Sequence, residues 1–228
     1  LSTAIVGSAL SGCLSMFQES RKDTPLPDVP TGSWTQYGAD GGNTFATDAT
    51  VPTRGNLAWT SAAFTRWQPV VSDGAVYMTN FDPSKTGSVI ALDALDGAER
   101  WRTTLDADGD NGIVHVEDRC IVAYDAELVA LDPQSGDELW TQTTRGIDFW
   151  HQLVADEPTG TVLLATRHGV EAFDAENGER RWEVETVRDS VHAPAVSDGE
   201  VFTVGRVDGA KALVGLSLED GSMLWQTE

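Results

Sequence analysis

Four closely spaced carboxylates have a pattern that could bind a calcium ion. Asp106, Asp108 and Asp110 alternate along the chain, and Glu117 stands eleven residues after the first of them. Carboxylates at the first, third, fifth and twelfth positions are ligands of a twelve-residue calcium loop. Such a loop has glycine at its sixth position, where this chain has Asn111, and the flanking residues resemble strands rather than helices. We therefore favour a solvated acidic loop over a weak calcium site.

A second candidate site is made of aromatic and cationic side chains that precede apolar segments. Trp67, Trp150 and His192 each stand at the same distance before such a segment, with Gly112 at the equivalent position in a fourth. Aromatic faces beside a few polar groups suit a sugar, a peptide or a quinone. Packing between neighbouring elements is the alternative, and the choice depends on where the fold places these positions.

Other catalytic and metal-binding patterns are missing from the sequence. Cys13 and Cys120 are the two cysteines, so there is neither an adjacent cysteine pair nor a Cys-x-x-Cys-His haem site. Cys120 lies in an apolar segment and is expected to be a small buried side chain. We expect no catalytic residue, metal site or resident cofactor in this chain. The histidines, which lack the spacing of zinc ligands, are His115, His151, His168 and His192.

The N-terminal residues have the composition of a secretion signal. Residues 1–10 are small or apolar and uncharged, but a membrane span needs about 20 apolar residues. Leu10-Ser11-Gly12-Cys13 resembles the lipobox of secreted lipoproteins, in which the cysteine receives the lipid. We expect residues 1–13 to be a signal-peptide remnant with lipid attachment at Cys13, the alternative being an apolar N-terminus with an incidental cysteine. Residues 14–33, rich in proline, serine and charge, are expected to tether the protein to the outer face of the cell membrane.

The charge balance excludes one class of partner. The chain has 36 acidic and 15 basic residues, a formal net charge of −21. This surface repels nucleic acid and anionic lipid headgroups, so binding through a basic patch is excluded. Acidic residues occur along the whole chain, and their repulsion would be screened at molar salt, where the Debye length is about 3 Å. We therefore expect the protein of a halophile, in particular a haloarchaeon.

The strongest pattern is a repeat. Each copy has an apolar segment ending in Asp or Ser, a glycine four residues later and a tryptophan four residues after that. Successive tryptophans, starting from Trp59, are 42, 39, 42 and 43 residues apart. This period is that of a four-stranded β-propeller blade. The copies, each ending in its docking tryptophan, run from Val89 to Trp101, Leu128 to Trp140, Val170 to Trp182 and Leu213 to Trp225.

The residues of each copy fit the strands and turns of a blade. An apolar segment without alternation is typical of a strand buried on both faces. The aspartate can accept hydrogen bonds from the turn, the glycine supplies a positive φ, and the tryptophan can fill the gap between blades. We therefore predict an all-β β-propeller over residues 34–228. Its four complete blades are placed at about 67–105, 112–144, 150–186 and 191–228.

The motif Ala-Leu-Asp-x-x-x-Gly-x-x-x-Trp resembles the tryptophan-docking motif of PQQ-like propellers. This family includes quinoprotein dehydrogenases and BamB-type assembly lipoproteins. Residues 33–40 with Asn43 and Thr44 are similar to the opening segment of its secreted members. The resemblance covers residues 34–228 and implies eight blades, of which this chain would hold about four.

The resemblance implies the fold but does not decide the function, because blades of this type occur in both enzymes and scaffolds. We expect a lipid-anchored extracytoplasmic β-propeller that acts as a binding or assembly scaffold for a partner that the sequence does not identify. The alternatives are a dehydrogenase that needs PQQ and calcium, and a carbohydrate- or peptide-binding module. In each case Trp67, Trp150 and His192 are expected at the mouth of the central channel, where a ligand would bind.

Overall fold

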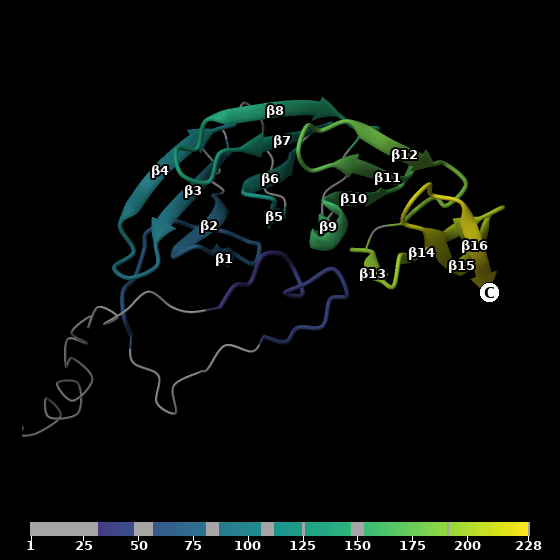
Figure 1. Cartoon of the computed structure of the whole chain (residues 1–228), viewed down its shortest axis with the longest axis horizontal. Helices are drawn as coiled ribbons and strands as arrows, with labels where there is room; N and C mark the ends of the chain where they lie inside the picture. The colour runs from purple at the N-terminus through teal and green to yellow at the C-terminus, as the bar shows by residue number, and fades with distance from the viewer. Residues whose placement is uncertain are drawn as a thin grey trace, which may run out of the picture.

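The computed structural model of the chain describes residues 32–47, 57–80, 87–105, 112–124, 126–146, 153–190 and 192–227. In this part of the chain, sixteen β-strands form four separate antiparallel sheets, with one short 3-10 turn at Glu157–Thr159. The sheets follow one another around an arc, with their first strands on its concave side (Figure 1). The predicted fold class, a partial β-propeller of four-stranded blades, is confirmed.

Each blade is a meander whose strands pair in chain order, from the concave side of the arc outwards. Blade 1 contains β1 (Val70–Ser72), β2 (Ala75–Asn80), β3 (Ser88–Asp93) and β4 (Glu99–Thr104). Blade 2 contains β5 (Ile113–Val116), β6 (Arg119–Tyr124), β7 (Glu127–Leu131) and β8 (Glu138–Thr143). Blade 3 contains β9 (Val154–Asp156), β10 (Thr161–Thr166), β11 (Gly169–Asp174) and β12 (Arg180–Val184). Blade 4 contains β13 (Ala195–Ser197), β14 (Glu200–Val207), β15 (Ala210–Ser217) and β16 (Met223–Thr227).

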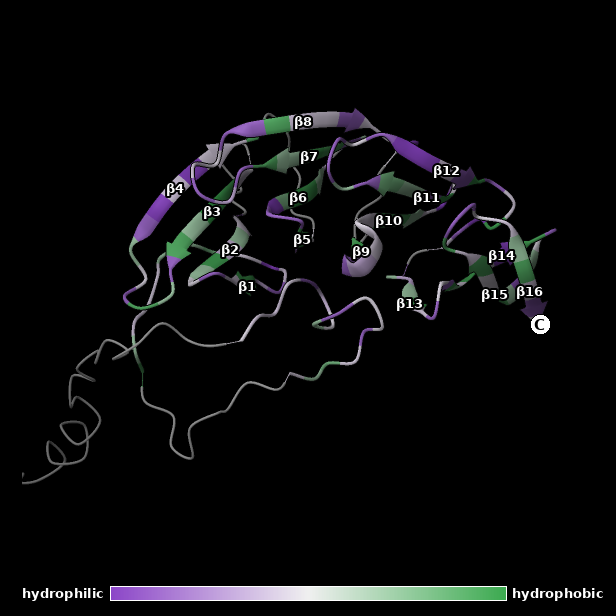
Figure 2. Cartoon of the chain, in the orientation of Figure 1, coloured by the Kyte–Doolittle hydropathy of each residue, from purple (hydrophilic) through white to green (hydrophobic). Residues whose placement is uncertain are grey.

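The middle strands are apolar because neighbouring blades cover both of their faces. In β3, every side chain from Val89 to Leu92 is buried. The outermost strands instead have polar residues that face solvent, as in β4, where Arg100 and Arg102 flank the buried Trp101. Figure 2 shows this gradient as green in the middle strands and purple along much of β4 and β12. The core is therefore a series of apolar clusters between successive blades.

The turn between the third and fourth strands is held by an aspartate, as Asp132 illustrates. Its Oδ1 accepts hydrogen bonds from the amides of Ser135 (2.9 Å) and Gln134 (2.8 Å), and these donors hold the pKa of Asp132 below its usual range. Gly136 closes the turn with a φ of +76°, which favours glycine. A Cβ at Gly136 would lie 2.6 Å from the ring of Trp101. The glycine therefore also lets the tryptophan of blade 1 reach blade 2.

The two ends of the blades form different surfaces. At one end, the chain that leaves the fourth strand runs beside the hairpin of the second and third strands, as in the 2.9 Å bond from Leu105 N to Gly87 O. We call this end the linker face. At the other end, the turn after the first strand lies beside the turn after the third, as in the 2.8 Å bond from Leu218 N to Gly199 O. We call this end the turn face.

Candidate functional site

Four tryptophans dock on the following blade in the same way. Each indole N–H donates to the main-chain carbonyl just after the turn aspartate or serine, and each ring lies against the turn glycine. Trp101 and Trp182 are buried, and Trp140 is half-buried against the apolar cluster between blades 2 and 3. The pairs are Trp59 with Ala94 (3.0 Å), Trp101 with Pro133 (2.9 Å), Trp140 with Ala175 (3.2 Å) and Trp182 with Leu218 (2.8 Å).

Trp225 has the same place in its blade but a different contact. Its indole N–H donates to Glu200 Oε2 of its own blade at 3.1 Å, and its ring centroid lies 5.9 Å from that of Phe202. Val204 and Leu213, on the same side of the sheet, are exposed. The sequence groups Trp225 with the docking tryptophans, whereas the structure gives it no neighbouring blade in the described residues.

The interface between blades 1 and 2 buries three groups that could do chemistry. Tyr77 stacks on His115 with ring centroids 5.6 Å apart and donates to Pro133 O at 3.3 Å. Burial raises the pKa of Tyr77 and of the free thiol of Cys120, and lowers the pKa of His115. All three are therefore neutral near pH 7, and their arrangement is that of a packed interface rather than an activated nucleophile.

A buried carboxylate between blades 2 and 3 was missed by the sequence analysis. Glu171 Oε2 accepts a hydrogen bond from Arg145 N at 3.1 Å. Arg180 Nη2 forms an ion pair with Glu171 Oε1 at 2.9 Å, but the angles of this contact are not those of a hydrogen bond. Arg145 and Arg180 both also pair with Glu183. Burial raises the pKa of Glu171 despite these partners.

The sequence did contain a signal for this carboxylate. Glu171 stands in a third strand at the position where the other three blades have Ile90, Val129 and Val214. A charge at a repeat position that is otherwise apolar predicts a buried ion pair. Comparing the four copies position by position would have found it.

The predicted channel-mouth residues are only partly brought together. Trp67 and Gly112 line one small cavity, together with Gln68, Ile113, Leu153 and Tyr37. The cavity has a volume of about 10 Å³, which is room for about one water molecule. His192 is exposed and does not line it, and Trp150 lies outside the described residues.

Residues 34–43, which we call the strap, lie on the concave side of the arc (Figure 1). The strap makes seven hydrogen bonds to the blades, and every blade receives at least one. Trp34 and Val71 exchange two main-chain bonds of 2.8 Å, and Thr35 O accepts from His115 N at 2.7 Å. The remaining bonds join Gln36 to both main-chain groups of Ala155 (2.7 and 2.8 Å), Gly41 O to Val196 N (2.6 Å) and Asn43 Nδ2 to Pro194 O (2.8 Å).

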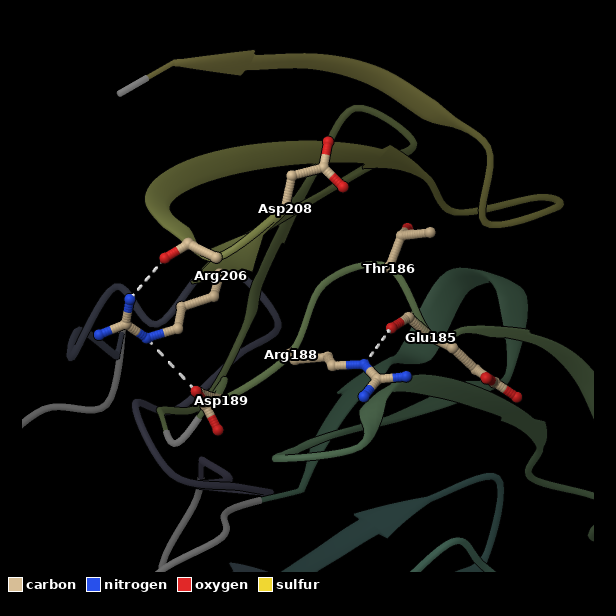
Figure 3. Close-up of a pocket in the computed structure, with 7 residues that line it drawn as sticks. Glu185, Thr186, Arg188, Asp189, Arg206 and Asp208 are labelled. Atoms are coloured by element: carbon tan, nitrogen blue, oxygen red, sulfur yellow. Dashed lines mark hydrogen bonds and ion pairs between the residues drawn. The ribbon is translucent and has the colours of Figure 1, made fainter.

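A larger pocket lies on the linker face between blades 3 and 4 (Figure 3). It has a volume of about 430 Å³ and is lined by side chains from 185–189 and from the tip of the β14–β15 hairpin. Arg188 and Arg206 exchange main-chain bonds of 2.6 and 2.9 Å that join its walls. Figure 3 shows their guanidinium groups pointing to opposite sides, one toward Glu185 and the other toward Asp189. The pocket is thus a mixed-charge groove rather than an anion site.

The remaining candidates fall largely outside the described residues. Asp106, Asp108, Asp110 and the lipid-attachment candidate Cys13 are not described, and Glu117 lies exposed in the turn between β5 and β6. The described residues contain no cluster of three or more His, Cys, Asp or Glu side chains that could hold a metal ion. Nor does this part of the chain contain a helix with the length and apolar character of a membrane span.

Known proteins share this architecture. The chain is 36% identical over 141 residues to the serine/threonine-protein kinase AfsK of Streptomyces coelicolor, covering 59% of the chain and 16% of the kinase. It is 31% identical over 170 residues to the outer membrane protein assembly factor BamB of Burkholderia pseudomallei, covering 71% of the chain and 42% of that protein. The quinohemoprotein alcohol dehydrogenase of Comamonas testosteroni superposes with a TM-score of 0.66 at 17% identity, over 94% of the chain and 42% of the enzyme.

The chain spans less than half the length of each of these proteins. A family model extends the likeness to both halves of the chain, because it matches residues 46–149 and again residues 125–228. The chain therefore belongs to the PQQ-like repeat family (PQQ_2) that is described as outer membrane protein assembly factor BamB.

Proposed function

We propose that the protein is an extracytoplasmic binding or assembly scaffold, anchored by a lipid on Cys13, in a halophilic organism. Its blades form the scaffold, and its partner is another macromolecule rather than a resident cofactor. The net charge of −21 disfavours a nucleic-acid partner.

The small size of the cavity beside Trp67 carries this proposal. Tyr37 of the strap, Trp67 of the segment before β1 and Leu153 close on a space of about 10 Å³. A ligand pocket for a small organic molecule has a volume of about 300 Å³ or more. The described residues at this place therefore form a packed contact, which suits a scaffold better than a cofactor-dependent enzyme.

The relatives favour a scaffold without excluding an enzyme. They are named as a kinase, an assembly factor and an alcohol dehydrogenase, so this type of blade occurs in proteins of different activity. By sequence, the alignment with the assembly factor covers 71% of this chain and that with the alcohol dehydrogenase covers 50%. We carry over from the assembly factor the role of a scaffold and no particular partner.

Titration with PQQ and Ca²⁺, followed by tryptophan fluorescence at molar salt, tests this proposal. We expect no saturable quenching, because among the described residues the cavity beside Trp67 is too small for a planar quinone. Saturable quenching at micromolar PQQ that is lost in Trp67→Phe and kept in Trp225→Phe would place the quinone at the channel mouth. Together with calcium-dependent oxidation of an alcohol or sugar, it would replace the scaffold by a dehydrogenase.

The lipid anchor has a separate test. In the full-length protein expressed in a halophilic host, Cys13→Ser is expected to move the protein from the membrane fraction to the soluble fraction. Cys120→Ser, which changes a buried thiol, is the control and should leave the distribution unchanged. Equal distributions of both variants would contradict the anchor and leave the scaffold proposal standing.

A further inference from the structure

The strap contacts the blades at equivalent positions. It bonds to Val71, His115, Ala155 and Val196, each of which is the next-to-last residue of the first strand of its blade. Their pairing partners Val76, Cys120, Val162 and Val201 are likewise equivalent in the second strands. Each of the four amides donates to the strap and so points away from the second strand. The concave side of the arc therefore presents one main-chain donor from each blade, in a row.

The first part of the strap uses one residue for each blade. Trp34, Thr35 and Gln36 bond in turn to blades 1, 2 and 3. Trp34 and Thr35 use main-chain atoms, whereas Gln36 uses its side-chain amide, whose oxygen and nitrogen bond to the N–H and C=O of Ala155. A carboxamide has one acceptor and two donors, so it can replace a peptide unit in such a pair.

The second part of the strap reaches blade 4 through a compact turn. Gly38 has a φ of +76°, and Phe45 N bonds back to its carbonyl at 2.8 Å. Gly41 passes so close to blade 3 that a Cβ there would lie 3.1 Å from Ala155 O. The contacts with blade 4 are again a main-chain carbonyl, that of Gly41, and a carboxamide, that of Asn43.

All seven bonds of the strap to the blades are thus made by main-chain atoms or by two carboxamides. The strap adds an aromatic side chain to these bonds, that of Tyr37, which lines the small cavity with Trp67 and Leu153. A binding surface that uses main-chain hydrogen bonds can bind peptides of many different sequences. Contacts at a few side-chain positions then make the binding specific. The blades therefore present a row of main-chain groups that pairs with the strap, at Val71, His115, Ala155 and residues 194–196, and we call this row the groove.

We propose that this groove binds a short peptide segment whose third residue has a carboxamide side chain, and that Trp34–Gln36 is its resident and exchangeable occupant. A segment of a partner protein with the same backbone path and a glutamine or asparagine at the third position would bind in its place. The proposal is independent of the scaffold role, because an enzyme with this strap would have the same groove.

The experiment separates the strap from the blades after folding. A protease recognition site is inserted between residues 47 and 57, the chain is folded at molar salt and then cut. A fluorescent peptide of residues 32–47 is added, and its binding is followed by anisotropy. We expect saturable binding to the cut protein, competition by unlabelled peptide, and no binding to the uncut chain, whose groove is occupied in cis.

Variant peptides test the role of the carboxamide. Gln36→Leu removes both bonds to Ala155 and is expected to weaken binding by roughly tenfold or more. Ala46→Ser, at an exposed position beyond the strap, is the control and should bind as the original peptide does. Equal binding of the Gln36→Leu peptide would contradict the assigned role of Gln36.

Three further results would overturn the exchangeable groove. One is that the cut segment stays bound and never exchanges, which would make it a permanent part of the fold. Another is that the blades lose their β circular dichroism when the segment leaves. The last is that the labelled peptide fails to bind to cut blades that remain folded and have released their own segment.

Discussion

The interfaces between blades and the concave side of the arc are built from different kinds of residue. At the interfaces, each contact repeats: a tryptophan, a glycine and a carbonyl meet in the same geometry four times. On the concave side, the strap bonds to four equivalent backbone positions with four different residues of its own. Repeated residues therefore specify the blades, whereas residues that occur once specify what fills the channel side.

The largest expected effect compares Trp101, which docks on the following blade, with Trp225, whose described contacts lie within its own blade. Trp101→Ala removes a buried ring and its bond to Pro133 O, and should cost about 3–5 kcal/mol of unfolding free energy. Trp225→Ala, which removes a half-buried ring, should cost no more than about half of that. Urea unfolding at molar salt measures both values. Equal costs would mean that the neighbouring blade adds nothing to the docking motif.

Alanine substitutions at two glycines distinguish the cost of a clash with a tryptophan ring from the cost of backbone strain. Gly136 and Gly199 have φ values of +76° and +77°, but a Cβ would meet the ring of Trp101 at Gly136 and nothing within 4 Å at Gly199. Gly136→Ala should cost about 2–4 kcal/mol, and Gly199→Ala about 1–2 kcal/mol. The same unfolding experiment measures the difference. If the two costs coincide, the turn glycine serves the backbone alone.

Lowering the ionic strength should destabilise the whole propeller, because repulsion among its acidic side chains is then less screened. Acidic residues exceed basic ones by 21, and their repulsion extends further when the Debye length grows from about 3 Å at molar salt to about 30 Å at 0.01 M. We expect the melting temperature to fall by several degrees or more between these conditions. Circular dichroism measures it. An unchanged melting temperature would argue against adaptation to high salt.

The smallest expected effect concerns Glu171, the charged residue at a third-strand position that is apolar in the other three blades. Burial raises the folded-state pKa of Glu171, so the folded protein binds a proton more tightly there than the unfolded chain does. The contribution of Glu171 to stability is therefore present at low pH and is lost as the pH rises from the usual carboxyl range through the raised pKa. In Glu171→Gln this part of the pH dependence should disappear. A pH profile that is identical in the two proteins would contradict the assignment.

The blades could be predicted from the sequence because their information is local and repeated. The spacing from Asp132 to Gly136 and Trp140 contains the turn, its positive φ and the docking ring within nine residues. The exception within the pattern was also visible, since Glu171 interrupts an apolar strand. What the repeat could not show is that the indole of Trp225 bonds to Glu200 of its own blade, because Glu200 lies outside the motif.

The strap could not be predicted in the same way. Gln36 binds to Ala155, 119 residues further along the chain, and its partners are main-chain atoms that have no residue signature. The sequence singled out Trp67 for the channel mouth but not Tyr37, which closes the same cavity. It also grouped His192 with Trp67, whereas the structure leaves His192 exposed and away from that cavity.

Hydrogen–deuterium exchange of four amides tests the central claim most directly. The N–H groups of Val71, His115, Ala155 and Val196 are donated to the strap. In the intact chain we predict that these amides are protected to a degree similar to those within the sheets. In Gln36→Leu, Ala155 should lose more protection than the other three. Fast exchange of all four in the intact chain would contradict the account, because the strap would then not occupy the channel side.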